Sequence, residues 1–111
     1  MLIASRELNF RDGDTLRKIP IRLFSPLRLG GGTWTCRYEV GWPDRPSVNE
    51  GSGVDAIQAI IVALQMVGAE IYTSNYHEAG MLYLDAAGHG YGFPVPHAIR
   101  DLLVGDDKKY F

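Results

Sequence analysis

The chain has 111 residues, of which 46% are hydrophobic and 22% charged, and its formal net charge is -2. These values are typical of one globular domain, residues 1–111, and exclude a disordered or fibrous chain. No apolar run approaches the about 20 residues that cross a bilayer, and the start of the chain lacks the regions of a signal peptide. The lone cysteine, Cys36, cannot form an internal disulfide, so we expect a cytoplasmic protein with no membrane partner.

Basic residues show only a weak bias towards the first half of the chain. Residues 1–50 carry eight Lys and Arg against six Asp and Glu, whereas residues 51–111 carry three against seven. Nucleic-acid-binding domains are usually strongly basic over a whole face. Nucleic acid is therefore not an expected partner, and the interleaved charges predict a solvated sheet face with weak cross-strand ion pairs.

Two alternating segments near the start, Leu2–Phe10 and Thr15–Phe24, predict a pair of antiparallel strands. Asp-Gly between such segments is a strong signal for a hairpin with a two-residue loop. If Asp12-Gly13 is that loop, Phe10 lies opposite Thr15. The shared apolar face then contains Leu2, Ala4, Leu8, Phe10, Ile19, Ile21 and Leu23.

Residues 33–40 predict a third strand, because apolar and polar side chains alternate along them. The apolar set is Trp34, Cys36, Tyr38 and Val40. Residues 41–51 contain two prolines together with Asp, Asn and Ser. They predict a loop, with room for a short strand near Val48.

The strongest helix signal runs from Ser52 to about Tyr72. Ser52 can cap the helix, and Asp55 three residues later resembles a shortened capping box. Gly68 interrupts the pattern, but the seven-residue step from Leu64 to Ile71 favours a continuous helix over a strand at residues 70–73. The apolar residues that recur at helical spacing are Ile57, Ile60, Ile61, Leu64, Val67 and Ile71.

The last third of the chain predicts a short strand, Met81–Asp85, and a short terminal helix. Pro96 and Gly105 suit the first turn and the end of that helix, and the charged residues 106–109 form a tail that stays loose unless the last two residues dock. The buried side of the helix contains Ile99, Leu102 and Leu103. The whole pattern predicts an α+β fold, in which an antiparallel sheet of four or five strands, in β-β-β-α-β-α order, carries one long helix on one face.

Several short motifs resemble a family of small bacterial proteins that is known only as a domain of unknown function. They are Ile3-Ala4-Ser5-Arg6-Glu7-Leu8 at the start, Gly53-Val54-Asp55-Ala56-Ile57-Gln58-Ala59, Gly68-Ala69-Glu70-Ile71-Tyr72, and Gly92-Phe93-Pro94. The resemblance covers most of the chain. It implies a small, single-domain bacterial protein, and it brings no activity, cofactor or site residue.

Three histidines, His77, His89 and His97, share one stretch with Glu78 and Asp85. Histidine and carboxylate side chains together can bind zinc or another divalent metal. The spacings of twelve and eight residues match no compact metal motif. We therefore favour surface or loop histidines and expect no cofactor, and a metal site at His77 and His89 is the weaker alternative.

The segment 88–92, Gly-His-Gly-Tyr-Gly, is the most unusual local sequence. Alternating glycines permit backbone conformations closed to other residues and let a ligand approach closely. The segment matches neither a P-loop nor the dinucleotide fingerprint. We favour a tight turn between two short strands over a ligand loop that would use His89, Tyr91 and the nearby Asp85.

Arg6 lies on the predicted apolar face, beside Leu8 and opposite Ile19. A buried guanidinium is costly unless it is paired. We favour a position near the sheet edge, where the head of the side chain reaches water. The alternative is an ion pair with a helix carboxylate, either Asp55 or Glu70.

Two further side chains carry expectations. Cys36 alternates with Trp34 and Tyr38, so we expect a buried, inert thiol rather than a nucleophile. Trp42 lies beside a proline in a loop and is a candidate contact for a partner, because tryptophan is enriched at interface hot spots. It could equally cap the core.

No assembled catalytic constellation is recognisable, so the sequence favours a non-enzymatic interaction or binding module. Its partner would be another protein or a second copy of the chain. Ligand-binding candidates are Arg6, Asp85, His89 and Tyr91, and the interface candidate is Trp42. The alternative is a small metal- or ligand-binding enzyme that uses His77, Asp85 and His89.

Overall fold

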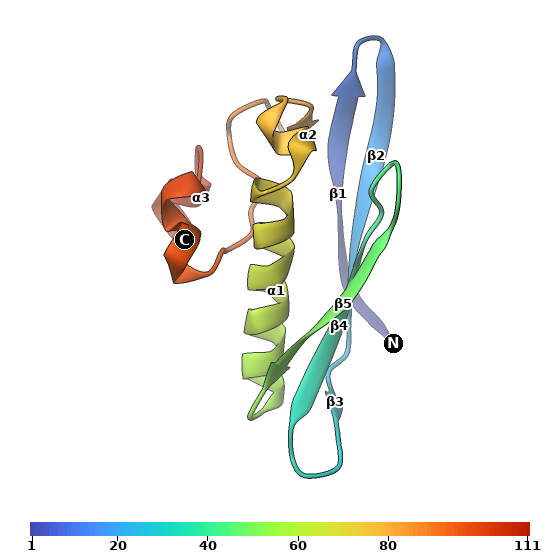
Figure 1. Cartoon of the computed structure of the whole chain (residues 1–111), viewed down its shortest axis with the longest axis vertical. Helices are drawn as coiled ribbons and strands as arrows, with labels where there is room; N and C mark the ends of the chain where they lie inside the picture. The colour runs from blue at the N-terminus through green and yellow to red at the C-terminus, as the bar shows by residue number, and fades with distance from the viewer.

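The computed structural model describes residues 1–111 and has the predicted α+β architecture, an antiparallel sheet with one long helix packed against it (Figure 1). The strands are β1 (Leu2–Asp12), β2 (Thr15–Phe24), β3 (Leu27–Arg28), β4 (Trp34–Val40), β5 (Ser47–Gly53) and β6 (Leu82–Tyr83). The helices are α1 (Ala56–Tyr72), α2 (Asn75–Glu78), the 3-10 helix η1 (His97–Leu102) and α3 (Asp107–Tyr110). None of these helices is both long and apolar enough to cross a membrane.

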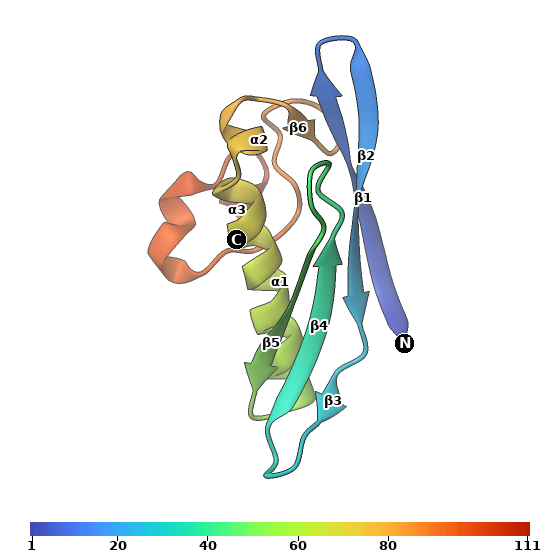
Figure 2. The ribbon, with the colours of Figure 1, turned by 45° about the vertical axis from the view of Figure 1, so that its right-hand side comes forward.

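All strand pairs are antiparallel, and the order across the sheet is β5, β4, β2, β1 and β6. β3 pairs with β4 beyond the end of β2. Figure 2 shows β4 and β5 lying across the N-terminal half of α1. β6 pairs with β1 only at Asn9 and Phe10, so the rest of that edge of β1 has no strand beside it.

The first hairpin forms as predicted, but its loop lies one residue later. Asp12 pairs with Thr15, so Gly13 and Asp14 form the two-residue loop. Gly13 has a φ of 61° and no other residue type in the chain has a positive φ, as expected for a type II′ turn, which needs a positive φ only at its first central residue. Phe10 therefore lies opposite Arg17 and not opposite Thr15.

This correction shifts the pairing by two residues and leaves the predicted faces unchanged, since side chains alternate with a period of two. Five of the seven predicted face residues are buried: Leu8, Phe10, Ile19, Ile21 and Leu23. Leu2 and Ala4 are exposed, so their assignment to the core was wrong. The strand is irregular between them, and the N-terminal end of β1 projects away from α1 in both views (Figures 1 and 2).

The short strand allowed near Val48 within the predicted loop is present and longer than expected, because β5 runs from Ser47 to Gly53 and pairs with β4 along its whole length. Its glycines allow α1 to approach the strand closely. A Cβ at Gly51 would lie 2.4 Å from the backbone nitrogen of Ala63, and one at Gly53 would lie 2.6 Å from that of Ala59. Glycine has low strand propensity, so helix packing rather than local preference explains this strand.

The long helix is confirmed through Gly68 to Tyr72, and its cap is Asp55. Asp55 Oδ1 accepts a hydrogen bond from the Gln58 N–H at 2.8 Å, whereas Ser52, the predicted cap, belongs to β5. The strand alternative at residues 70–73 is wrong. A Cβ at Gly68 would lie 1.8 Å from the Pro94 carbonyl oxygen, so this glycine admits the C-terminal segment against the helix.

The buried row of α1 differs from the predicted one. Its innermost residues are Ala59, Ala63, Val67 and Ile71, spaced four apart. Ile57 is 69% exposed and Ile61 is 49% exposed. Alanines face the glycines of β5 because only small side chains fit that separation, and the larger isoleucines lie to one side.

The C-terminal part is more ordered than predicted. β6 is a shorter version of the predicted strand, and the terminal helix is a 3-10 helix that ends at Leu102. Leu103 is buried, but Leu102 is 39% exposed, contrary to its predicted place in the buried stripe. The tail is not loose, because α3 forms there and Asp107 is 2% exposed.

Candidate functional site

Arg6 lies opposite Ile21 and not opposite Ile19. Its Nη1 donates to the carbonyl oxygens of Tyr91 at 3.1 Å and Gly92 at 2.8 Å. The guanidinium carbon lies 4.9 Å from the centre of the Phe93 ring. None of the ion pairs in the structure includes Arg6, so the alternative of a pairing with a helix carboxylate was wrong. The favoured position near the sheet edge fits the structure, because Arg6 is exposed there.

A cavity of about 280 Å³ opens beside Arg6. It lies on the part of β1 that β6 leaves uncovered, between the sheet, α1 and the C-terminal segment. Arg22 also lines it, but Arg22 alternates with buried residues of β2 and its guanidinium lies 4.0 Å from Glu39. The apolar wall consists of Ala4, Ile21, Leu23, Leu64, Val67, Phe93, Pro94 and Phe111. We call this cavity the Arg6 pocket.

Gly92 is required where Arg6 crosses the C-terminal segment. Its φ is 77°, and an added Cβ would lie 2.6 Å from Arg6 Nη1. A side chain there would strain the backbone and displace the guanidinium. Gly92 therefore helps to hold Arg6 in position. Arg6 is the one cation of the pocket wall that forms no ion pair with a carboxylate.

The same segment is held from its other side by a buried carboxylate. Asp107 accepts hydrogen bonds from the N–H groups of Tyr91 and Gly92, both at 2.8 Å, and from the hydroxyl of Tyr72. Gly90, with a φ of 92°, leaves room for this carboxylate, since a Cβ there would lie 2.7 Å from Asp107 Cγ. Burial, followed by the charge of Asp107, raises the pKa of Tyr91 to about 12.

The glycine-rich segment therefore leads into a wall of the pocket, which Gly92, Phe93 and Pro94 form. No strand follows β6 in the chain, so the favoured prediction of a turn between two short strands was wrong. The wall depends on Asp107, which sequence reasoning placed in a charged tail. Nothing in the sequence marks Asp107 as buried, because backbone N–H groups are among its donors and almost every residue carries one.

His77 belongs to an aromatic cluster behind this wall. Its Nδ1 lies 2.5 Å from the hydroxyl of Tyr91, and its ring packs edge-on against Tyr72 with a centroid distance of 4.9 Å. Burial lowers the pKa of His77 below its ordinary 6.5. The imidazole is therefore held neutral near pH 7, and its contacts lie within the cluster.

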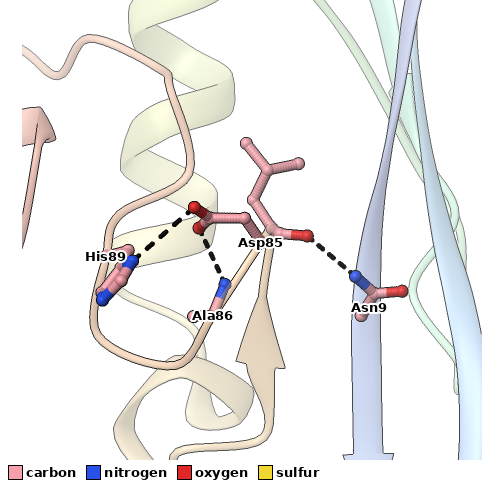
Figure 3. Close-up of polar contacts among 5 residues, drawn as sticks. Asn9, Asp85, Ala86 and His89 are labelled. Carbon is pink, nitrogen blue, oxygen red and sulfur yellow. Dashed lines mark hydrogen bonds and ion pairs between the residues drawn. The ribbon is translucent and has the colours of Figure 1, made fainter.

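Asp85 and His89 form a separate, exposed pair (Figure 3). His89 Nδ1 lies 3.6 Å from Asp85 Oδ2, and the Ala86 N–H donates to Asp85 Oδ1 at 2.7 Å. That backbone hydrogen bond is the main cause that lowers the pKa of Asp85. Asn9 Nδ2 donates to the Leu84 carbonyl at 2.9 Å and ties the loop to β1. This geometry stabilises a loop.

The histidine-containing stretch does not converge on one point. His77 contacts Tyr91 and Tyr72, His89 contacts Asp85, and His97 is exposed in η1. No three or more His, Cys, Asp or Glu side chains are grouped closely enough to hold a metal ion.

Trp42 is half-buried near the C-terminal end of α1, where Glu70 accepts several hydrogen bonds. Glu70 accepts from the hydroxyl of Tyr38, from Trp42 Nε1 at 3.2 Å and from Ser47 Oγ at 3.0 Å. The Trp42 ring stacks on Tyr76 with a centroid distance of 5.3 Å. Glu70 was missed as an anchor, although it is the one charged residue of an otherwise uncharged helix.

Cys36 is fully buried and its Sγ lies 3.2 Å from the Phe24 carbonyl oxygen. The prediction of a buried thiol is confirmed, and burial raises the pKa of that thiol. On the solvent face, Glu39 lies 3.7 Å from Arg37 and 4.0 Å from Arg22. The contact between Arg22 and Glu39 joins β2 to β4 and is a predicted weak cross-strand pair, whereas Arg37 and Glu39 both belong to β4.

The fold and the pocket define a small α+β protein with an apolar cavity of about 280 Å³ at the edge of its sheet. The chain belongs to a family described as a domain of unknown function (DUF6968), whose model matches residues 4–95. The predicted membership of an uncharacterised family is thereby confirmed. The matched range contains Arg6 and Gly92 and ends before Asp107. Comparison with curated proteins found no match, and comparison with solved structures found none either.

Proposed function

We propose that this protein is a non-enzymatic binding module that holds a small apolar ligand with a carboxylate or similar anionic group in the Arg6 pocket. One observation carries the proposal. The pocket has an apolar wall, and the guanidinium in that wall has no carboxylate partner within the chain.

Arg6 is well placed to receive an anion. Its Nη1 is fixed by two backbone carbonyls, and the carbonyls neutralise none of its positive charge. Its Nε and Nη2 donors make no hydrogen bond within the chain. A guanidinium presents its donors in a planar fork that matches a carboxylate. Because the fork is already oriented, binding costs little side-chain entropy.

The size of the pocket limits the ligand. A volume of about 280 Å³ lies just below the roughly 300–1,000 Å³ of most ligand sites. It admits an aliphatic chain or a single aromatic ring, and it excludes a dinucleotide. Burial of such a group contributes about 25 cal/mol per Å² of apolar surface, and the anion selects the orientation.

Isothermal titration calorimetry with octanoate and octanol tests this function. We expect octanoate to bind more tightly, and Arg6→Gln to weaken octanoate binding roughly 10- to 100-fold, the loss of a charge-assisted hydrogen bond. Ala4→Leu fills the pocket from an exposed strand position and should abolish binding of both. Arg17→Gln, at the hairpin end of β2, is the matched control. Failure of both probes to bind, or equal binding to wild type and Arg6→Gln, would refute the proposal.

The cellular setting is part of the same proposal. A bacterial cytoplasm agrees with the free, buried thiol of Cys36, because free cysteines persist in reducing compartments. The enzyme alternative at His77, Asp85 and His89 has less support, since His77 contacts Tyr91 and does not join the pair that Asp85 and His89 form.

A further inference from the structure

The exposed side of α1 is unusual for a helix that faces water. Glu70 is its single charged residue among 17, and that carboxylate already accepts three hydrogen bonds from other elements. Surface helices normally carry charged residues opposite their apolar stripe, and helices that are apolar on all sides are normally buried. The composition of α1 therefore predicts that its outer side is covered.

The chain itself covers only half of that outer side. The Pro94 carbonyl packs against Gly68 in the C-terminal half of the helix. The N-terminal half has no such cover, and Figure 1 shows the C-terminal segment and α3 beside the C-terminal half of α1 only. Ile57 and Ile61 lie on this uncovered half, one helical turn apart, and are 69% and 49% exposed.

We define the open α1 face as Val54, Ile57, Gln58, Ile61 and Gln65. Val54, which precedes the helix, is 79% exposed. The face holds no acidic or basic side chain. Contiguous exposed apolar residues of this kind mark interaction sites. A strongly charged partner would find no complementary group here.

We propose that the open α1 face is the contact between two copies of this chain, related by a two-fold axis that passes near Ile61. A two-fold axis places the residues nearest to it against their own copies, so a charge close to the axis would meet the same charge. An uncharged patch avoids this repulsion. The ridge of Ile57 and Ile61, four residues apart, can pack into the groove beside the same ridge of the second helix.

Gln65 suits the same arrangement, whereas Gln58 Oε1 already accepts a hydrogen bond from the Val54 N–H within its own chain. A glutamine amide carries both donors and acceptors, so it can pair with its own copy across a two-fold axis, which a carboxylate or an ammonium group cannot do. Gln65 lies on the turn that follows Ile61 and can border the apolar ridge. The contact uses side chains outside the apolar wall of the Arg6 pocket, so it is independent of the proposed function.

Sedimentation equilibrium and light scattering on the full chain test the contact. Wild type should be a dimer, and Ile61→Glu and Ile61→Lys alone should each raise the dissociation constant about 100-fold or more, because like charges meet at the axis. Mixing the two variants should restore dimers. Leu16→Glu, at a residue that is 63% exposed at the hairpin end of β2, should leave the dimer intact.

Far-UV circular dichroism spectra of the two Ile61 variants should match wild type, since Ile61 is 49% exposed in one copy and its change leaves the fold intact. A monomeric wild type at every concentration, dimers that survive both Ile61 changes, or a mixture that stays monomeric would each overturn the contact. Dimers that Leu16→Glu disrupts would overturn it as well.

Discussion

The crossing of Arg6 and Gly92 allows a prediction with an internal control. Gly92→Ala places a methyl group 2.6 Å from Arg6 Nη1 at a φ of 77°, whereas Gly88→Ala places one in open space at a φ of 81°. Both variants carry the same backbone strain, about 1–2 kcal/mol for a residue with a Cβ at positive φ. Only the Gly92 variant also displaces the guanidinium.

The additional cost is set by the two hydrogen bonds that Arg6 loses. Hydrogen bonds to a charged group contribute about 1.5–3 kcal/mol, and the exposure of Arg6 reduces that value. We therefore expect Gly92→Ala to lower the free energy of unfolding by about 1–2 kcal/mol more than Gly88→Ala. Urea denaturation monitored by tryptophan fluorescence measures both.

A double-mutant cycle identifies the cause. In an Arg6→Ala background the methyl group meets no guanidinium, so Gly92→Ala should cost no more than Gly88→Ala. Equal costs of the two glycine variants in the wild-type background would refute this reasoning. So would a Gly92 cost that is unchanged by Arg6→Ala.

Three further predictions concern the core, the buried carboxylate and pH. Gly51→Ala should cost about 3 kcal/mol or more in urea denaturation, because its Cβ would meet helix backbone at 2.4 Å; Gly30→Ala, with open space around it, should be near neutral. Asp107→Asn should cost about 2–4 kcal/mol by the same assay, since an amide cannot accept from all three donors, and a loss below that of Gly30→Ala would contradict this. Burial lowers the pKa of His77, so below its ordinary pKa of about 6.5 the unfolded chain binds a proton that the folded chain does not. Stability should therefore fall as the pH drops below 6.5. In His77→Gln the thermal melting temperature should depend less on pH across that range, and an unchanged slope of melting temperature against pH would exclude His77 as the cause.

The parts of the fold that follow from local pattern were predictable. Alternation assigned Leu8 and Ile19 to one face even though the loop was misplaced, because an error of two residues preserves the alternation. The long helix followed from its apolar spacing and from Asp55 near its start. Tertiary packing did not need to be known for either element.

The remaining features depend on contacts between distant segments. β5 contains Glu50-Gly51-Ser52-Gly53, which reads as a loop until α1 is placed against its glycines. That same approach selects Ala59 and Ala63 for the buried row in place of the isoleucines. The spacing of the larger apolar residues correctly placed Val67 and Ile71 in the buried row, but it also placed Ile57 and Ile61 there, which are exposed.

The candidate site was predictable only in part. Arg6 was identified as a charged residue on an apolar face, and it lies in the pocket wall. Its partners are main-chain carbonyls 85 and 86 residues away, and a carbonyl has no signature in a sequence. Asp107 was hidden for the same reason, since two of its three donors are main-chain N–H groups.

The peptide groups of Tyr91 and Gly92 connect the first strand to the last helix, with N–H groups on Asp107 and carbonyls on Arg6. Local opening of α3 should therefore release Arg6 as well, so that these distant regions exchange amide hydrogens with deuterium as one cooperative unit. An anion bound at the guanidinium would slow that exchange at the opposite end of the chain.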